Sequence, residues 1–220
     1  MNRNINIGVE KEIDYANACY EGMGLDPHLL TKILYYLKTG RIKRVLEFGS
    51  GSSTDFLLSV REKYQLDYTI DSFDHDERYS YNPNLLHEDF NLRIRELVQY
   101  DDKQFSKILS GEEMPLGATV PKSEYGNFRI KNVFYDIKDQ DLTGTYDLVI
   151  LDGPNGNGRS ISFNYISKYV KKGSIIVIDD YHHYPFVENC QKLISTDIVR
   201  KVNLFDFHEL HGYVILEVVE

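Results

Sequence analysis

The chain has 220 residues, 25 of them basic and 34 acidic, which gives a formal net charge of −9. This length suits one domain that folds without disulfides or metals as staples. For the chain as a whole, the acidic balance excludes a nucleic-acid-binding protein of the usual kind, because phosphate binding needs an excess of Lys and Arg. The hydrophobic fraction of 42% excludes a disordered chain.

The first 20 residues lack the apolar segment and the small-residue cleavage site of a secretory signal. No uncharged apolar run approaches the ~18 residues that a membrane span needs. Cys19 and Cys190 are far apart and form no C-x-x-C pair, so neither a disulfide scaffold nor a cysteine-rich zinc site is indicated. We therefore expect a cytoplasmic protein that binds neither nucleic acid nor membrane, and formation of a homo-oligomer stays open.

The first half of the chain alternates between expected helices and strands. A helix is predicted over residues 27–38, with Asp26 as its N-cap and Pro27 in its first turn. A buried strand over residues 44–48 runs into a glycine turn, and a second helix follows over residues 53–64. The next expected strand, residues 68–74, ends in several acidic side chains.

Residues 79–129 are the least predictable part of the sequence. We expect one helix there, over residues 85–98, followed by a polar segment with several Gly and Pro residues. Two interpretations stay open, because long insertions in compact domains are often functional. The segment is either a surface insertion with little core of its own or a tyrosine-rich lid over a substrate. The tyrosines in question are Tyr79, Tyr81, Tyr100 and Tyr125.

The second half returns to regular alternation. The apolar runs LVIL and IIVI have no polar residues between them, which is typical of strands buried on both faces of a parallel sheet. The last two expected strands are joined by the short segment ELHG, which favours an antiparallel hairpin. The fold class is therefore α/β, with a doubly wound, mostly parallel sheet and an antiparallel C-terminal strand. We treat residues 1–220 as one domain, with an N-terminal helical extension (1–40) and the insertion (79–129).

The string VLEFGSGSST follows the first buried strand. A glycine turn at this place lets a ligand approach the backbone and points the N-terminus of the next helix at that ligand. Thr54 stands where a dinucleotide-binding motif has its third glycine, and Glu47 puts a carboxylate where a pyrophosphate would sit. A carboxylate suits a ligand with a cationic end, so NAD or a nucleotide sugar fits less well.

This motif, an apolar strand and an acid followed by Gly-x-Gly, resembles the first motif of the class I SAM-dependent methyltransferases. The resemblance implies a Rossmann-like sheet of seven strands and S-adenosylmethionine (SAM) as the cofactor. It implies that the first strand and its turn contact the cofactor through Glu47, Gly49, Ser50 and Gly51.

The same resemblance assigns further cofactor contacts. Asp74 lies 27 positions after Glu47, where the family keeps an acid that binds both ribose hydroxyls, and a carboxylate is a natural acceptor for a diol. Asp71 and Asp76 are rivals, because the register of the strand decides between them. The adenine contacts are expected from His75, beside Asp74, and from Asp136, which follows the string NVFY.

Three acids end the two apolar strands of the second half: Asp152 in LDG, and Asp179 and Asp180 in GSIIVIDDY. Carboxyl ends of neighbouring strands meet at one edge of a sheet, and clustered acids repel unless a cation is present. Oxygen ligands of this kind suit Mg²⁺. The set resembles that of the metal-dependent O-methyltransferases of catechol and macrocin type, which implies a metal on all three and a catalytic role for Asp152. In the other interpretation, the acids only cap the segments that follow them.

Two further groups are candidates near the acids. His182 and His183 could take a proton from an acceptor, although adjacent residues of an extended segment cannot both face one pocket. The alternative is a pair of solvated loop histidines. Arg159, in the unusual linker PNGNGRS, could bind an anionic or sugar group of the substrate, or it could pair with the acids.

Together these features predict a SAM-dependent methyltransferase that methylates a hydroxyl of a small acceptor, such as a sugar or a glycosylated metabolite, with Mg²⁺ assisting. A metal-independent N-methyl or other SAM-family transferase, such as an aminopropyl-type enzyme, is the alternative among enzymes. A non-catalytic partner subunit of the same fold is the alternative outside them.

Overall fold

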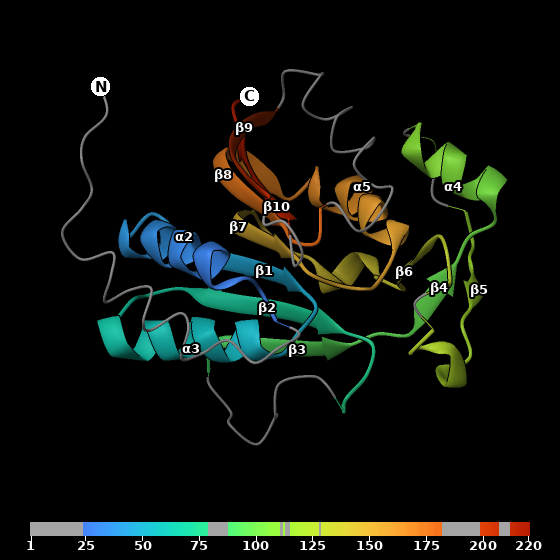
Figure 1. Cartoon of the computed structure of the whole chain (residues 1–220), viewed down its shortest axis with the longest axis horizontal. Helices are drawn as coiled ribbons and strands as arrows, with labels where there is room; N and C mark the ends of the chain where they lie inside the picture. The colour runs from blue at the N-terminus through green and yellow to red at the C-terminus, as the bar shows by residue number, and fades with distance from the viewer. Residues whose placement is uncertain are drawn as a thin grey trace.

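The structure is a computed structural model that describes residues 24–78, 88–110, 112, 115–127, 129–181, 199–206 and 212–220 (Figure 1). Within these ranges, its centre is a seven-stranded sheet with the order β3-β2-β1-β7-β8-β10-β9. These strands are β1 (Arg44–Phe48), β2 (Thr69–Asp74), β3 (Phe90–Ile94), β7 (Tyr146–Leu151), β8 (Val170–Ile178), β9 (Val199–Asp206) and β10 (Gly212–Val218).

The strand directions confirm the predicted fold class. The pairs β1–β2, β2–β3, β1–β7 and β7–β8 are parallel. Strand β10 is antiparallel to both of its neighbours, β8 and β9. The parallel strands therefore bring their carboxyl ends to one edge of the sheet, where the predicted site residues of β1, β2, β7 and β8 meet.

Helices cover both faces of the sheet, because alternate residues of a strand point to opposite sides. Val45 packs with apolar residues of α2 (Pro27–Lys38) and α3 (Ser52–Tyr64). Its neighbour Leu46 packs on the other face, with α5 (Ser162–Ile166) and a small second sheet. Helix α2 has its predicted bounds, and Asp26 accepts the N-capping hydrogen bond from the backbone N–H of His28 at 2.8 Å.

The predicted helix over residues 85–98 is wrong wherever the structure describes that segment. Residues 90–94 form β3, which pairs with β2 at the edge of the main sheet, and β4 (Leu97–Gln99) follows in the small sheet. The apolar residues Phe90, Leu92 and Ile94 alternate with polar ones, which is the period of a strand. Part of the presumed insertion is therefore a strand of the main sheet.

The small sheet has the order β5-β4-β6, with β5 (Ala118–Thr119) and β6 (Val133–Tyr135), and its strands are antiparallel. It lies beside α4 (Asp102–Leu109), beyond the ends of β2 and β3 (Figure 1). Tyr100 and Tyr125 are buried in the cluster shared with the main sheet, so these two do not form an exposed cover. Tyr79 and Tyr81 lie outside the described residues.

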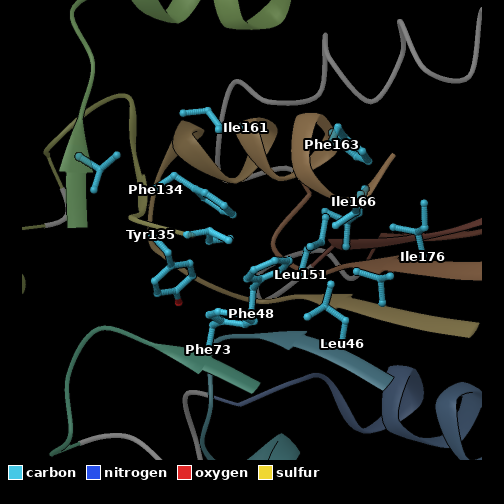
Figure 2. Packing of buried hydrophobic residues seen from close by; sticks show 14 of the residues in the cluster. Leu46, Phe48, Phe73, Phe134, Tyr135, Leu151, Ile161, Phe163, Ile166 and Ile176 are labelled. Carbon is cyan, nitrogen blue, oxygen red and sulfur yellow. The ribbon is translucent and has the colours of Figure 1, made fainter. Parts of the chain in front are cut away.

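Three short 3₁₀ helices complete the described elements: η1 (Lys122–Glu124), η2 (Asp139–Asp141) and η3 (Asn157–Ile161). None of the helices in the described ranges is long and apolar enough to cross a membrane. The aromatic side chains of Phe48, Phe73, Phe134 and Tyr135 meet where the ends of β1 and β2 face β6 (Figure 2). The candidate site lies next to this aromatic contact.

Candidate functional site

The glycine turn after β1 packs directly against the turn after β7. The Phe48 carbonyl accepts hydrogen bonds from the backbone N–H groups of Asp152 and Gly153, at 2.8 and 2.7 Å. Gly49 has φ +97°, and a Cβ there would lie 2.9 Å from the Gly153 nitrogen. Only glycine fits this position, because any side chain would be strained and would also meet backbone. The two predicted motifs are thus in contact.

Glu47 lies inside the glycine turn and is fully buried. Its carboxylate accepts hydrogen bonds from the hydroxyls of Ser53 at 2.7 Å, Thr54 at 2.5 Å and Ser72 at 2.6 Å. Burial raises the pKa of Glu47 to about 7, although these three hydrogen bonds lower it. These contacts fasten the end of β1 to β2 and to the first turn of α3. Direct contact of Glu47 with a cationic ligand stays a prediction.

Asp74 adjoins the glycine turn at the end of β2. One carboxylate oxygen accepts from the Ser50 backbone N–H at 2.9 Å. The other accepts from the backbone N–H groups of His75 at 2.6 Å and Asp76 at 3.0 Å. The predicted cofactor residues Ser50 and Asp74, from different elements, are therefore in direct contact.

The two rivals of Asp74 have other partners. Asp71 pairs with Arg44 at 2.9 Å, Arg93 at 2.7 Å and the Tyr146 hydroxyl at 3.0 Å, and two of these partners are the first residues of β1 and β7. Burial raises the pKa of Asp71, but the hydrogen bonds and charge of these partners together outweigh it, so the pKa is lowered. Asp76 pairs with Arg78, and this bond lowers its pKa to about 2. Asp74 is the acid of the three that borders the turn.

The two predicted adenine contacts have different partners in the structure. The His75 ring lies beside Asp74, with 3.3 Å between its Nδ1 and a carboxylate oxygen. Asp136 follows β6 in the small sheet, where its side chain pairs with Lys138 at 2.5 Å and its N–H donates to the Glu96 carbonyl. NVFY belongs to the small sheet, and contact of His75 or Asp136 with an adenine stays a prediction.

The three acids after β7 and β8 converge as predicted. Asp152, Asp179 and Asp180 each offer an oxygen within 4.8 Å of the others. Asp179 is 2% exposed, and its Oδ1 has no hydrogen-bond partner within the described part of the chain. Burial, and after it the charges of Asp152 and Asp180, raise the pKa of Asp179 well above its ordinary value. The three carboxyls therefore form a close group of hard oxygen ligands whose charges repel one another.

Arg159 pairs with these acids, which is the second of the two alternatives that the sequence left open. Its guanidinium is buried and lies 3.3 Å from an Asp180 oxygen and 3.7 Å from an Asp152 oxygen. It also donates to the carbonyls of Asp179 at 3.0 Å and Pro154 at 2.9 Å. Binding of a substrate group by Arg159 stays a prediction.

Comparisons with known proteins place the fold. No protein-family model matches the chain, and no curated protein matches its sequence. The O-methyltransferase TomG from Streptomyces achromogenes, solved with SAM, is similar in structure, with 12% identity, a TM-score of 0.55, and coverage of 98% of this chain and 91% of TomG. An O-methyltransferase from Bacillus cereus, solved with SAH, matches with 12% identity, a TM-score of 0.53, and coverage of 98% and 94%. The chain has the fold of the class I SAM-dependent methyltransferases.

A third structure with this methyltransferase fold is MycE from the mycinamycin biosynthetic pathway, solved with Mg, SAH and mycinamycin VI. It is 15% identical, with a TM-score of 0.53, and the match covers 95% of this chain but 55% of MycE.

His182 and His183, the predicted bases, lie outside the described residues. Sequence reasoning missed Ser72 and Tyr135 at the site, because an isolated serine or an aromatic residue in a strand gives no signal of its own.

Proposed function

We propose that the chain is a SAM-dependent methyltransferase that methylates a hydroxyl of a small acceptor, such as a sugar or a glycosylated metabolite. One observation carries this proposal: in a methyltransferase fold, the glycine turn contacts Asp74 on one side and the Asp152–Gly153 turn on the other. The arrangement offers a carboxylate for a ribose diol and a second carboxylate for an acceptor, with a backbone turn between them.

The proposed roles follow from this placement. Gly49, Ser50 and Gly51 present backbone to the cofactor, and Glu47 holds their turn in shape through its three hydroxyl partners. SAM supplies a methyl group on a sulfonium, which an acceptor oxygen takes by direct displacement while the C–S electron pair stays on sulfur. The chain's part is to align the two reactants, because correct orientation removes much of the barrier.

The acceptor hydroxyl must lose its proton, and the acid cluster is where we place that step. Asp152 and one of His182 and His183 are our candidates to take the proton. The cluster also fits a divalent cation, because Asp179 has a buried oxygen without a hydrogen bond from any described residue and the three acids are hard ligands. When bound, Mg²⁺ would lower the pKa of a coordinated hydroxyl and orient it.

Titration calorimetry with SAM and SAH tests the proposal. We expect wild-type protein to bind both compounds and Asp74→Asn to lose at least about tenfold in affinity, because a carboxylate makes stronger hydrogen bonds to a diol than an amide does. The matched control is Asp71→Asn, which changes another acid of the same strand, β2, that pairs with Arg93 instead. It should leave SAH affinity unchanged. Absence of SAM and SAH binding to the wild type would overturn the proposal and favour a partner subunit.

A second candidate, a metal-independent transferase, is favoured by the position of Arg159. Its guanidinium already offsets part of the cluster's negative charge. Turnover that persists in EDTA, with an acceptor found by screening, would select this alternative. Turnover that requires Mg²⁺ would select the metal-assisted one.

A further inference from the structure

Tyr135 carries a polar group that no described residue satisfies. The residue ends β6 and is fully buried, with its ring stacked on that of Phe48 at 5.9 Å between centroids. Its hydroxyl has no hydrogen-bond partner among the residues that the structure describes. Figure 2 shows this oxygen at the margin of the aromatic cluster. Buried hydroxyls almost always have a partner, because an unmade hydrogen bond costs free energy, and Phe would fill the same space without that cost.

The hydroxyl of Tyr135 lies where the motifs of the proposed site meet. A Cβ on Gly153 would be 2.4 Å from this oxygen, and Gly153 is the residue that packs against Gly49. Burial, and after it the nearby charge of Asp74, raise the pKa of Tyr135 well above its ordinary value. The phenol therefore keeps its proton and is able to donate a hydrogen bond.

A second side chain near Asp74, that of His75, also has a buried polar atom to which no described residue forms a hydrogen bond. The Nδ1 atom of His75 is buried and makes no hydrogen bond to any described residue, although it lies 3.3 Å from an Asp74 oxygen. The rings of His75 and Tyr135 are 6.1 Å apart between centroids. Two polar atoms to which no described residue forms a hydrogen bond, one from β6 and one from the residue after β2, thus lie near the carboxylate that we assign to the ribose. Because the Tyr135 hydroxyl and the His75 Nδ1 atom lie in the same region, their positions indicate a ligand that supplies the missing hydrogen bonds to both.

We propose that Tyr135 is a cofactor-binding residue whose hydroxyl donates a hydrogen bond to a ribose oxygen of the bound sulfonium nucleoside. This inference rests on the proposed function. Asp74 offers only acceptor oxygens to a diol, whereas each ribose hydroxyl also accepts. A donor beside Asp74 completes the recognition, and the protonated phenol supplies it.

The test is Tyr135→Phe, which keeps the stacked ring and removes the oxygen alone. SAH should bind about 5- to 30-fold more weakly, the effect of one lost ligand hydrogen bond. 5′-Methylthioadenosine, which has the same ribose but no amino-acid group, should lose affinity by a similar factor. The melting temperature of the ligand-free variant should be unchanged or higher, because the variant removes an unsatisfied group.

The matched control is Tyr146→Phe, because the Tyr146 hydroxyl is bonded to Asp71 within the protein. That variant should melt at a lower temperature and bind SAH as the wild type does. Equal SAH affinity of wild type and Tyr135→Phe, or a melting temperature lowered as in Tyr146→Phe, would overturn the inference alone. A loss confined to SAH would overturn the ribose assignment. A wild type that binds neither compound would overturn the proposed function and this inference with it.

Discussion

The Glu47 carboxylate accepts a hydrogen bond from the Thr54 hydroxyl, with 2.5 Å between the two oxygens. Glu47 belongs to β1 and Thr54 to the first turn of α3, so this bond joins the two elements that the glycine turn connects. Thr54 also accepts from the Gly51 backbone N–H at 3.1 Å. The shape of the turn therefore depends on an acid that is shielded from solvent, and that acid is a natural place to test the site.

Glu47 should make the protein less stable as pH rises from 5 to 7.5. Burial raises its pKa from the ordinary 4.5 to about 7 in the folded chain. Between these two values the folded state keeps a proton that the unfolded state has released, so the free energy of unfolding falls as pH rises. For one such group the fall is about 2 kcal/mol over this range.

The variant Glu47→Gln removes that titration while keeping the shape of the side chain. Urea unfolding at pH 5 and at pH 7.5 gives the change in unfolding free energy for each protein. We expect the drop between the two pH values to be about 2 kcal/mol smaller in Glu47→Gln than in the wild type. The same drop in both proteins would show that Glu47 titrates normally.

Gly49→Ala should be far more damaging than Gly173→Ala. Both glycines have positive φ, +97° and +86°, so alanine at either costs about 1–2 kcal/mol in backbone strain. A Cβ at Gly173 meets no described atom within 4 Å, whereas one at Gly49 lies 2.9 Å from the Gly153 nitrogen. We expect Gly49→Ala to be less stable than Gly173→Ala by about 1–3 kcal/mol, measured by urea unfolding. Equal stability of the two variants would mean that the glycine turn after β1 does not pack against the Asp152–Gly153 turn.

The strands of the main sheet could be predicted where their residues face apolar surroundings on both sides. The runs in β7 and β8 read as buried strands because neither face admits a polar side chain. Strand β3 was missed for the opposite reason. It lies at the edge of the sheet and carries Asn91 and Arg93, which bond to Asp71 of the neighbouring strand. Its alternation has the period of a strand, but its stability depends on pairing with a strand about 20 residues away, which that alternation alone does not reveal.

The same contrast holds in the candidate site. Asp74 ends β2, and Asp152 and Asp179 directly follow the apolar strands β7 and β8, so the edge at which these acids lie could be predicted from the sequence. The destination of Arg159 could not, because it depends on how η3 packs on β6. Gly158 permits this packing, since a Cβ there would lie 1.6 Å from the Val133 carbonyl oxygen. The unsatisfied hydroxyl of Tyr135 likewise emerges only from tertiary packing.

Asp71→Asn should destabilise the protein by about 2–3 kcal/mol at pH 7. The carboxylate is 5% exposed and its partners Arg44 and Arg93 are partly exposed, so both arginines can rehydrate when the charge is removed. Because the folded-state pKa of Asp71 is lowered, its contribution is present above the ordinary carboxyl pKa and is lost as pH falls below it. The difference between wild type and variant in urea unfolding should therefore shrink at pH 3.

The control for Asp71 is Asp67→Asn, which breaks an exposed ion pair with Lys43. Surface pairs contribute little, so this change should stay within about 0.5 kcal/mol of the wild type. An effect of Asp71→Asn no larger than that of Asp67→Asn would show that the buried pairs of β2 and β3 do not stabilise the sheet.

Arg159→Gln should increase the affinity of the acid cluster for a divalent cation. The guanidinium lies within 4 Å of Asp152 and Asp180 oxygens, so its charge repels a metal and occupies their lone pairs. We expect Mn²⁺ to bind at least about tenfold more tightly to the variant, as measured by electron paramagnetic resonance of the free ion. Without metal the variant should be less stable, since the half-buried carboxylates of Asp152 and Asp180 lose a partner, and Mn²⁺ should restore that stability. Lys171→Gln is the matched control, because it removes one positive charge from the exposed partner of Asp147 and should leave Mn²⁺ affinity unchanged. If Arg159→Gln binds Mn²⁺ no better than the wild type, the guanidinium orients the carboxylates rather than competing for them.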